Sequence, residues 1–313
     1  MDCSDIAKYM VERQSILLRR RQGLPGPWTT DPILQNNRFC NVFREDDRVT
    51  IWIRENIREP FADHPNLWFM LAIARYINWP PTLNALIHTP GAWPSDNNFD
   101  PQSMTDVLEG LARDKVKVYT GAYMIRAESD PRTRWYTWTK HQYISEVVLG
   151  KLWTDRNKIQ TKLEACTTLE AAWGIVQEHH YTGWGPFMAY EWVTDLRHTR
   201  YLRNATDIMT WANAGPGAIR GLNRLHGRYI NTHPASTQTC SEMQELLLAL
   251  NHYNEAGFNA VFGGPYDPNG LKPPRFEMRD IEHTLCEFDK VQRVKLGQGK
   301  MRARYDWTKT TKL

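Results

Sequence analysis

Glycine, proline and acidic residues are closely spaced over residues 181–195, in an order that suits phosphate binding. Gly183, Trp184 and Gly185 precede Pro186, which predicts one helix, a tight turn and a second helix that begins at Pro186. Glycines accept the left-handed backbone angles of such a turn, and the amides at the start of the second helix point toward a bound anion. The segment is typical of a helix-hairpin-helix. We therefore expect Gly183, Trp184 and Gly185 to contact a DNA backbone.

Three carboxylates on or beyond the second helix are candidates for a catalytic base. Glu191 and Asp195 lie four residues apart and share a helix face, where two close carboxylates raise one pKa. Asp207 lies beyond the hairpin, near the position at which DNA glycosylases carry an aspartate beside the flipped-out nucleotide. Each has a structural alternative. Glu191 or Asp195 would form a salt bridge or an N-cap, and Asp207 would cap a short helix that begins near Ile208.

Two further segments carry groups that suit phosphate or pyrophosphate. Asn41, Arg44, Asp47 and Arg48 recur at helical spacing, so we expect them on one helix face. The two arginines would bind phosphate oxygens there, or form a surface ion-pair ladder with the acidic neighbours.

The second segment is the glycine-rich loop at 214–221, which opens another helix. The amides of Gly215 and Gly217, with Arg220 in the first turns behind them, form a natural anion site.

Several other kinds of chemistry are disfavoured. The chain has no Gly-x4-Gly-Lys-Ser/Thr sequence, which argues against a P-loop kinase. It has no HExxH and no spaced His/Cys set, so no metal site is predicted. The adjacent His179 and His180 point in different directions on a helix, which favours a structural or DNA-facing role. The cysteines are scattered and odd in number, which indicates a reducing compartment without disulfides: Cys3, Cys40, Cys166, Cys240 and Cys286.

The composition is that of a globular protein. Of the 313 residues, 41% are hydrophobic and 24% are charged. The net charge of +4 is compatible with a DNA partner but does not demand one. No apolar run reaches membrane-spanning length and no signal-peptide core is present, so we expect a cytoplasmic protein without a membrane partner.

The spacing of apolar residues predicts a mainly α fold, and strands are too scarce for a doubly wound α/β fold. Residues 1–37 are expected to be a lead-in segment, residues 38–294 a single catalytic domain, and residues 295–313 a basic tail. A weakly alternating stretch at 116–125 is the one candidate for extended structure. Helices are expected at 47–57, 67–77, 103–112, 139–149, 169–180, 186–196, 218–225, 240–256 and 280–293.

Five motifs occur together in order: Arg38-Phe-x-Asn-Val-Phe-Arg44-Glu-x-Asp-Arg48, Ala74-Arg-x-Ile-Asn-Trp-Pro80, Gly185-Pro-Phe-Met-Ala-Tyr-Glu191 with Thr194-Asp-Leu196, Ala214-Gly-Pro-Gly-Ala-x-Arg-Gly221, and Ile281-Glu-His-x-Leu-Cys-Glu-Phe-Asp-Lys290. From about residue 36 to 305 the chain resembles the α-glutamyl/putrescinyl thymine pyrophosphorylase family. Its members are also called amino acid:DNA transferases, and a related module is the helical domain of some 5-hydroxymethyluracil DNA kinases.

The resemblance implies a helix-hairpin-helix, DNA-glycosylase-like fold and a bacteriophage enzyme that hypermodifies thymine in double-stranded DNA. Such an enzyme displaces pyrophosphate from 5-pyrophosphoryloxymethyluracil with an amino acid or a polyamine. Arg38, Arg44, Arg48 and Arg220 would stabilise the leaving pyrophosphate. A base among Asp207, Glu191 and Asp195 would deprotonate the amine. On the last motif helix, Lys290 and Arg293 are assigned to DNA binding.

Other readings of the same residues stay open. A thiolate of Cys40 or Cys286 would also expel the leaving group by attack on the base. A DNA glycosylase that acts on a modified thymine and a non-catalytic reader of modified DNA are the alternative functions. No cofactor is implied, and the need for a divalent metal is left open.

Overall fold

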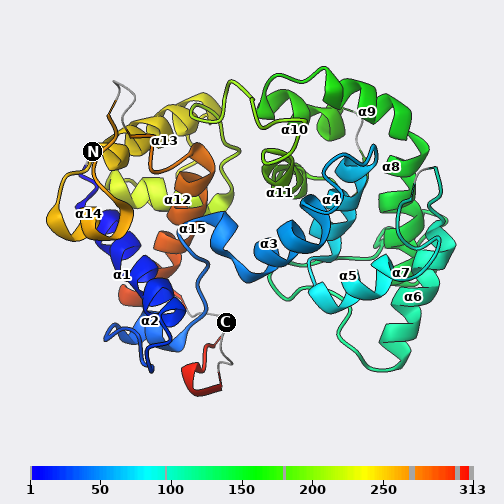
Figure 1. Ribbon diagram of the computed structural model, residues 1–313, viewed down its shortest axis with the longest axis horizontal. Helices are drawn as coiled ribbons and strands as arrows, with labels where there is room; N and C mark the ends of the chain where they lie inside the picture. The colour runs from blue at the N-terminus through cyan, green and yellow to red at the C-terminus, as the bar shows by residue number, and fades with distance from the viewer. Residues whose placement is uncertain (1, 96, 179–180, 268–271, 300–303, 310–313) are drawn as a thin grey trace. The chain divides into compact units, whose positions relative to one another are not determined.

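The computed structural model describes the chain except residues 1, 96, 179–180, 268–271, 300–303 and 310–313 (Figure 1). The contacts divide the chain into two compact units. Unit 1 comprises residues 1–47 and 208–313, and unit 2 comprises residues 48–207. Among the described residues both units are built of helices, with three isolated bridges and no strand, so the prediction of a mainly α fold is confirmed. The stretch at 116–125 forms no strand.

Unit 1 is organised around its longest late helix, α15 (Met278–Lys295), which packs against helices from both ends of the chain. Ile281, Leu285 and Phe288 bury one side of α15. The remaining elements are α1 (Ser4–Arg21), α2 (Pro32–Asn36), η1 (Arg44–Asp46), α12 (Pro216–Leu225), α13 (Ser236–Asn251), α14 (Ala256–Phe262) and η4 (Trp307–Lys309).

The expected lead-in and tail are both in contact with this unit. Helix α1 buries Ile6 and Met10 completely, because it packs against α14 and α15. In the tail, the Tyr305 amide donates to the Asn36 carbonyl at 3.0 Å. The contacts divide the chain after residues 47 and 207, whereas the sequence suggests boundaries at 37 and 294.

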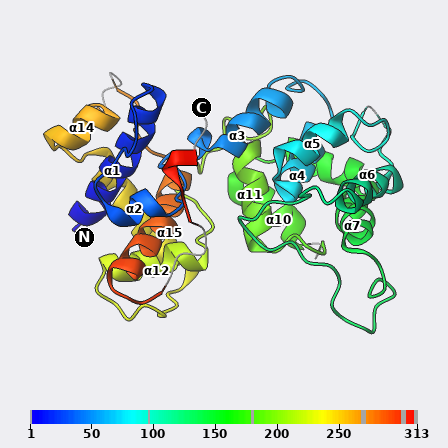
Figure 2. The same cartoon turned by 90° about the horizontal axis from the view of Figure 1, so that it is seen from below.

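Helices α12 and α15 lie side by side in both views (Figures 1 and 2), and two glycines of α12 set their separation. A methyl group at Gly221 would lie 2.5 Å from the Leu285 carbonyl oxygen, and one at Gly217 would lie 2.4 Å from the Cys286 sulfur. Only glycine fits at Gly221, because the neighbouring atom is backbone that cannot rotate away.

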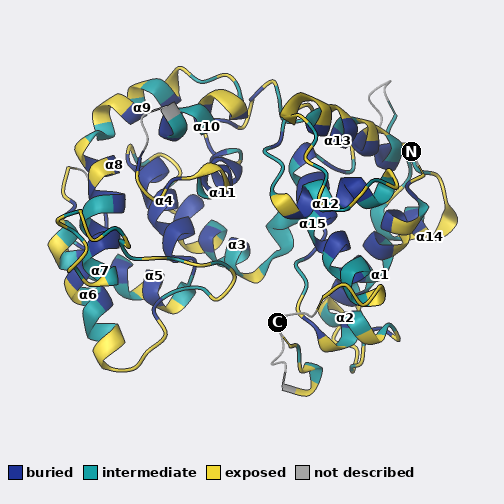
Figure 3. Ribbon diagram, turned by 180° about the vertical axis from the view of Figure 1, so that it is seen from behind, coloured by how far each residue is buried: buried dark blue, intermediate teal, exposed yellow. Residues whose placement is uncertain are grey.

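Unit 2 is built around α4 (Leu67–Ile77), which is buried along its whole length and packs against α11 (Pro186–Leu196), as the burial colouring in Figure 3 shows. Both helices have the bounds expected from the sequence. The other elements are α3 (Arg48–Ile53), η2 (Arg54–Arg58), α5 (Pro80–Ile87), α6 (Pro101–Arg113), α7 (Lys140–Gln142), η3 (Tyr143–Leu149), α8 (Gly150–Thr154), α9 (Arg156–Glu164) and α10 (Leu169–Glu178).

We predict that Gly221→Ala lowers the free energy of unfolding by about 1–3 kcal/mol, because the added methyl group forces α12 away from α15. Urea unfolding followed by circular dichroism measures the change. Gly257→Ala is the control in the same unit, since Gly257 lies in α14 with open space around it. An unchanged midpoint for Gly221→Ala would show that the two helices can separate without loss.

Candidate functional site

Helix α10, a turn that contains Gly183, and helix α11 follow one another along the chain in the predicted order. Gly183 adopts a left-handed φ of 82°, as expected, and a side chain there would meet the Tyr76 hydroxyl at 2.8 Å. Gly185 differs from the prediction, because its φ of −63° and ψ of 173° suit any residue. Pro186 begins α11 as predicted. His179 and His180 lie outside the described residues.

Trp184 does not reach the surface of the hairpin. Its side chain is 2% exposed and packs against Tyr76 and Trp192, with ring centroids 5.6 and 6.0 Å away. The expectation that Trp184 contacts DNA directly is therefore corrected, since a buried indole has no face available for a ligand. Gly183 and Gly185 are exposed and remain available at the turn.

Asp207 caps a helix, but not the one that the sequence suggests. Its Oδ1 accepts the Leu169 amide at 2.7 Å and its Oδ2 accepts the Glu170 amide at 3.0 Å. These are the first two amides of α10, which have no partner within the helix. The segment from Ile208 to Thr210 forms turns and no helix.

Asp195 is the acidic half of a buried ion pair with Arg75. Both side chains are 1% exposed, and both carboxylate oxygens accept from the guanidinium, with Arg75 Nη2 to Asp195 Oδ1 at 2.7 Å. The same guanidinium donates to Thr50 Oγ1 at 3.1 Å and to Asn78 Oδ1 at 3.3 Å. Burial opposes the charge of Arg75, but Asp195 outweighs it and raises the arginine pKa.

Glu191 lies one turn before Asp195 on α11 and is 5% exposed. Its charge also raises the pKa of Arg75, although less than the charge of Asp195 does. The structure thus brings Glu191 and Asp195 together around Arg75, while Asp207 is held separately at the start of α10.

The segment at 41–48 is not one helix, which corrects the predicted helix face. Only Arg44–Asp46 forms a short 3-10 turn, and Asp47 is extended with φ −74° and ψ 134°. Arg48 starts α3 and belongs to unit 2. Asn41 accepts from Arg13 Nη2 at 2.6 Å and donates to the Asp46 carbonyl at 2.7 Å, so it braces the segment. Arg38 is exposed, and among the described residues it forms no ion pair.

The predicted anion site at 214–221 is occupied by the protein's own carboxylates. The Gly215 amide donates to Glu282 Oε1 at 3.2 Å, at the start of α12. Arg220 Nε and Arg224 Nε donate to the two oxygens of Asp289, at 2.9 and 2.8 Å. Gly217 is buried against α15. Glu282 and Asp289 thus take the place that the sequence assigns to phosphate.

A cluster of ionisable groups forms where the 38–47 motif meets the motif on α15. Asp47 Oδ2 lies 3.6 Å from His283 Nε2 and 3.9 Å from Arg44 Nη1. Glu287 Oε2 accepts the Cys40 amide at 3.2 Å, and its Oε1 accepts from Lys290. We call these six residues the unit 1 cluster: Cys40, Arg44, Asp47, His283, Glu287 and Lys290.

Burial and charge act on the pKa values of the cluster in opposite directions. Burial opposes the ionisation of Asp47, but His283 and then Arg44 hold its pKa below the ordinary value. Burial also opposes the charge of Lys290, and Glu287 nevertheless raises the pKa of this amine. The neighbours of Asp47 and Lys290 therefore stabilise the charged forms of these two residues.

Burial keeps the thiols of Cys40 and Cys286 protonated. Burial raises the pKa of Cys40 well above its ordinary value, and it raises the pKa of Cys286 to about 12. A thiol in this state is a poor nucleophile at neutral pH, which argues against covalent attack by either residue on its own.

Lys290 and Arg293, assigned to DNA binding, lie on the last turns of α15. Lys290 is paired with Glu287, and the buried Nε of Arg293 makes no hydrogen bond. Neither side chain is fully exposed.

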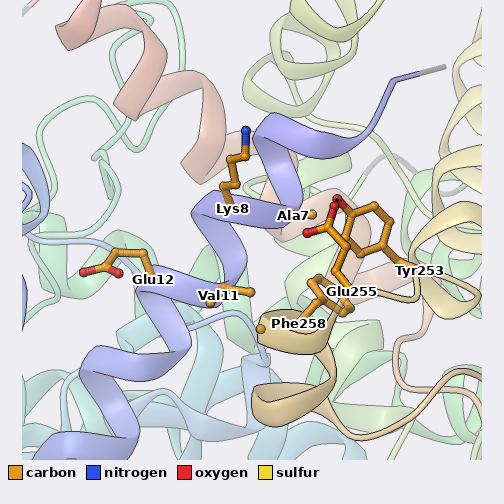
Figure 4. A pocket seen from close by; sticks show the side chains of 8 residues that line it. Ala7, Lys8, Val11, Glu12, Tyr253, Glu255 and Phe258 are labelled. Atoms are coloured by element: carbon orange, nitrogen blue, oxygen red, sulfur yellow. Dashed lines mark hydrogen bonds between the residues drawn. The ribbon is translucent and has the colours of Figure 1, made fainter.

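A hollow between α1 and the segment that leads into α14 has a volume of about 300 Å³ (Figure 4). Lys8, Glu12 and Glu255 supply charges around it, and Tyr253 donates to Glu255 at 2.6 Å. None of its lining residues belongs to the five motifs, so it is not the candidate site.

The comparison with known proteins agrees with the position of the motifs. A family model described as "5-hmdU DNA kinase, helical domain" matches residues 3–301. The chain therefore belongs to this family. A 5-hmdU DNA kinase of Bacillus phage SP10 is 25% identical over 333 aligned positions, which cover 96% of this chain and 46% of that protein. The chain thus spans about half the length of this relative. No solved structure matches the chain.

No helix within the described parts of the chain is long and apolar enough to cross a membrane.

Sequence reasoning missed His283 and Glu287 as members of a site, since they lie far along the chain from Cys40 and Asp47. The available signal was their occurrence within the last motif, which contains both residues beside Cys286 and Lys290. Arg75 was also missed, because its partner Asp195 lies far along the chain. The available signal was that Arg75 stands in the second motif.

We predict that Asp195→Asn destabilises the protein by about 3–5 kcal/mol, because the buried Arg75 loses the carboxylate that pairs with it directly. Thermal and urea unfolding measure the loss. The control is Asp130→Asn, which breaks an exposed pair with Arg132 in the same unit and is expected to leave the midpoint unchanged. Equal midpoints for the two variants would contradict a structural role for the buried pair.

Proposed function

We propose that this chain is a bacteriophage thymine-hypermodification enzyme. It displaces pyrophosphate from 5-pyrophosphoryloxymethyluracil in double-stranded DNA and joins an amine or amino acid to the base. The bond from the methylene carbon to the pyrophosphate oxygen breaks, a carbon–nitrogen bond forms, and one proton leaves the amine.

Membership of the helical-domain family supports a role in this pathway. The relative from phage SP10 is named for phosphorylation of 5-hydroxymethyldeoxyuridine in DNA.

The observation that carries the proposal is the unit 1 cluster. Two motifs far apart in sequence meet there, and Arg44, Asp47, His283, Glu287 and Lys290 supply ionisable groups of both signs. Structural ion pairs also occur in cores, but shifted pKa values at Cys40, Asp47 and Lys290 within one cluster are typical of functional sites. Departure of pyrophosphate needs cations close to the developing charge.

The reaction has other requirements, which we assign mostly to motif residues outside the unit 1 cluster. The target base has to leave the helical stack, which a DNA-glycosylase-like, helix-hairpin-helix fold accomplishes by base flipping. The exposed Arg38 and Arg48 suit phosphate contacts, and the turn at Gly183 and Gly185 suits the DNA backbone. Lys290 and Arg293 remain proposed contacts of the DNA.

The base that accepts the amine proton is proposed among Asp207, Glu191 and Asp195. An α-amino group is mostly protonated at neutral pH, so a proton acceptor is required. Asp207 and Asp195 each use both oxygens in bonds that hold the fold, and a catalytic role for either requires those bonds to open.

Two alternatives use the same DNA-binding elements. A glycosylase would use Asp207 to stabilise positive charge on the sugar and would release a free modified base. A reader would bind modified DNA and leave it unchanged. The deciding experiment is mass spectrometry of digested, pyrophosphorylated DNA after incubation with the protein and a mixture of amines. An amine adduct supports transfer, an abasic site supports a glycosylase, and unchanged DNA with retained binding supports a reader.

We predict that Gly183→Ala weakens binding to any duplex DNA, modified or not, because the turn needs a left-handed φ and its space is filled by Tyr76 and Val148. Gly110→Ala is the matched control, since Gly110 lies in α6 of the same unit with open space around it and has no proposed contact with DNA. Dissociation constants over a salt series measure the effect. Wild-type affinity should fall steeply with salt, and a flat dependence would count against clamping of the backbone.

A catalytic Asp207 predicts that Asp207→Asn reduces turnover by about 10²-fold or more, since an amide cannot accept the proton. The variant also loses one cap bond, which costs about 0.5–2 kcal/mol. Thr168→Ala is the matched control, because the Thr168 hydroxyl caps the same helix by accepting the Ala171 amide at 3.1 Å. If both variants keep full turnover, Asp207 is only a cap and Glu191 becomes the first choice for the base.

A further inference from the structure

Three side chains of the unit 1 cluster are grouped as ligands of one metal ion would be. The Cys40 sulfur, one oxygen of Asp47 and one ring nitrogen of His283 all lie within 4.8 Å of one another. We propose that Cys40, Asp47 and His283 bind a single divalent transition-metal ion of the zinc type. The proposal concerns metal binding alone and holds whether or not the chain transfers an amine.

The distance between Asp47 and His283 suits two metal ligands better than a hydrogen bond. Their Oδ2 and Nε2 atoms lie 3.6 Å apart, beyond the usual N–H···O range of about 2.7–3.2 Å. Two ligand atoms on one tetrahedral zinc ion lie roughly 3.3–3.7 Å apart, since each bond is about 2.0–2.3 Å long. The pair therefore already has ligand spacing, and the Cys40 sulfur lies within 4.8 Å of both atoms.

His283 Nε2 has no hydrogen-bond partner within 3.5 Å, and the residue is buried, with 7% of its surface exposed. A buried polar atom without a partner is costly, and a bound ion is one of its standard explanations. This nitrogen faces Asp47 Oδ2, the oxygen that accepts no backbone amide.

Hydrogen bonds to neighbouring residues hold two of the ligands in place. The backbone amide of Asn41 donates to Asp47 Oδ1 at 2.9 Å, which leaves Oδ2 directed at His283. Arg13 Nε donates to the Cys40 carbonyl at 2.9 Å, and Glu287 accepts the Cys40 amide. Such outer contacts orient metal ligands and are a regular part of metal sites.

The ligand types select the class of ion. A thiolate with an imidazole favours zinc and its neighbours over magnesium or calcium, which prefer sets made of oxygen alone. The ion would remove the thiol proton of Cys40, so binding releases a proton to solvent. Three protein ligands leave a fourth position for water or a phosphate oxygen.

The test uses the full chain, stripped with a chelator and titrated with Co²⁺ and then Zn²⁺. We expect one equivalent of Co²⁺, with a thiolate-to-metal charge-transfer band that Zn²⁺ abolishes by displacement. Cys40→Ser should remove the band, and Asp47→Asn or His283→Gln should weaken binding by more than the roughly 10–100-fold typical of an outer-contact residue. Cys286→Ser is the control and should keep the band, since Cys286 is not part of the ligand group.

An equal band in wild-type and Cys40→Ser protein overturns the proposal, and so does the absence of a bound ion at one equivalent. X-ray absorption of zinc on the wild-type chain gives a second test that needs no variant. One sulfur ligand supports the site and none overturns it. Circular dichroism and the melting temperature establish that each variant is folded.

Discussion

The close contact between α12 and α15 is the constraint on which unit 1 depends. Gly217 and Gly221 let the two backbones approach until a single methyl group would collide with Leu285 or Cys286. At that distance Arg220 and Arg224 reach the fully buried Asp289, and the start of α12 meets Glu282. A charge in a protein interior has to be paired. Because the glycines bring α12 close to α15, the buried carboxylates of α15 find their partners on α12.

Each unit uses its motifs in the same physical way. In unit 2, Arg75 neutralises Asp195 inside the contact of α4 with α11. In unit 1, the carboxylates of α15 are matched by Arg220, Arg224 and Lys290. Motif residues are thus largely committed to one another. Arg38 and Arg48 are the exposed exceptions among the cations of the first motif.

The sequence predicted the elements better than the use of their polar residues. Apolar periodicity located α4 and α11 to the residue, and glycine and proline chemistry located the turn at Gly183 and the start of α11. Local spacing could not show that Asp207 caps a helix 38 positions earlier, that Glu282 occupies the start of α12, or that Cys40 lies beside His283. Those partners are set by tertiary packing. The helix expected across residues 41–48 failed because Asn41 bonds to Asp46 and Asp47, which favours a turn over a continuous helix.

The order of the units along the chain has a consequence for synthesis on the ribosome. Unit 2 is one continuous stretch, whereas unit 1 is completed only when residues 208–313 join residues 1–47. Helix α1 presents Ile6, Met10 and Leu17 to partners in α14 and α15, which are translated more than 200 residues later. Unit 2 is therefore able to fold while α1 still exposes its apolar face. A nascent chain that stalls before α15 would present that face to chaperones or to other unfinished chains.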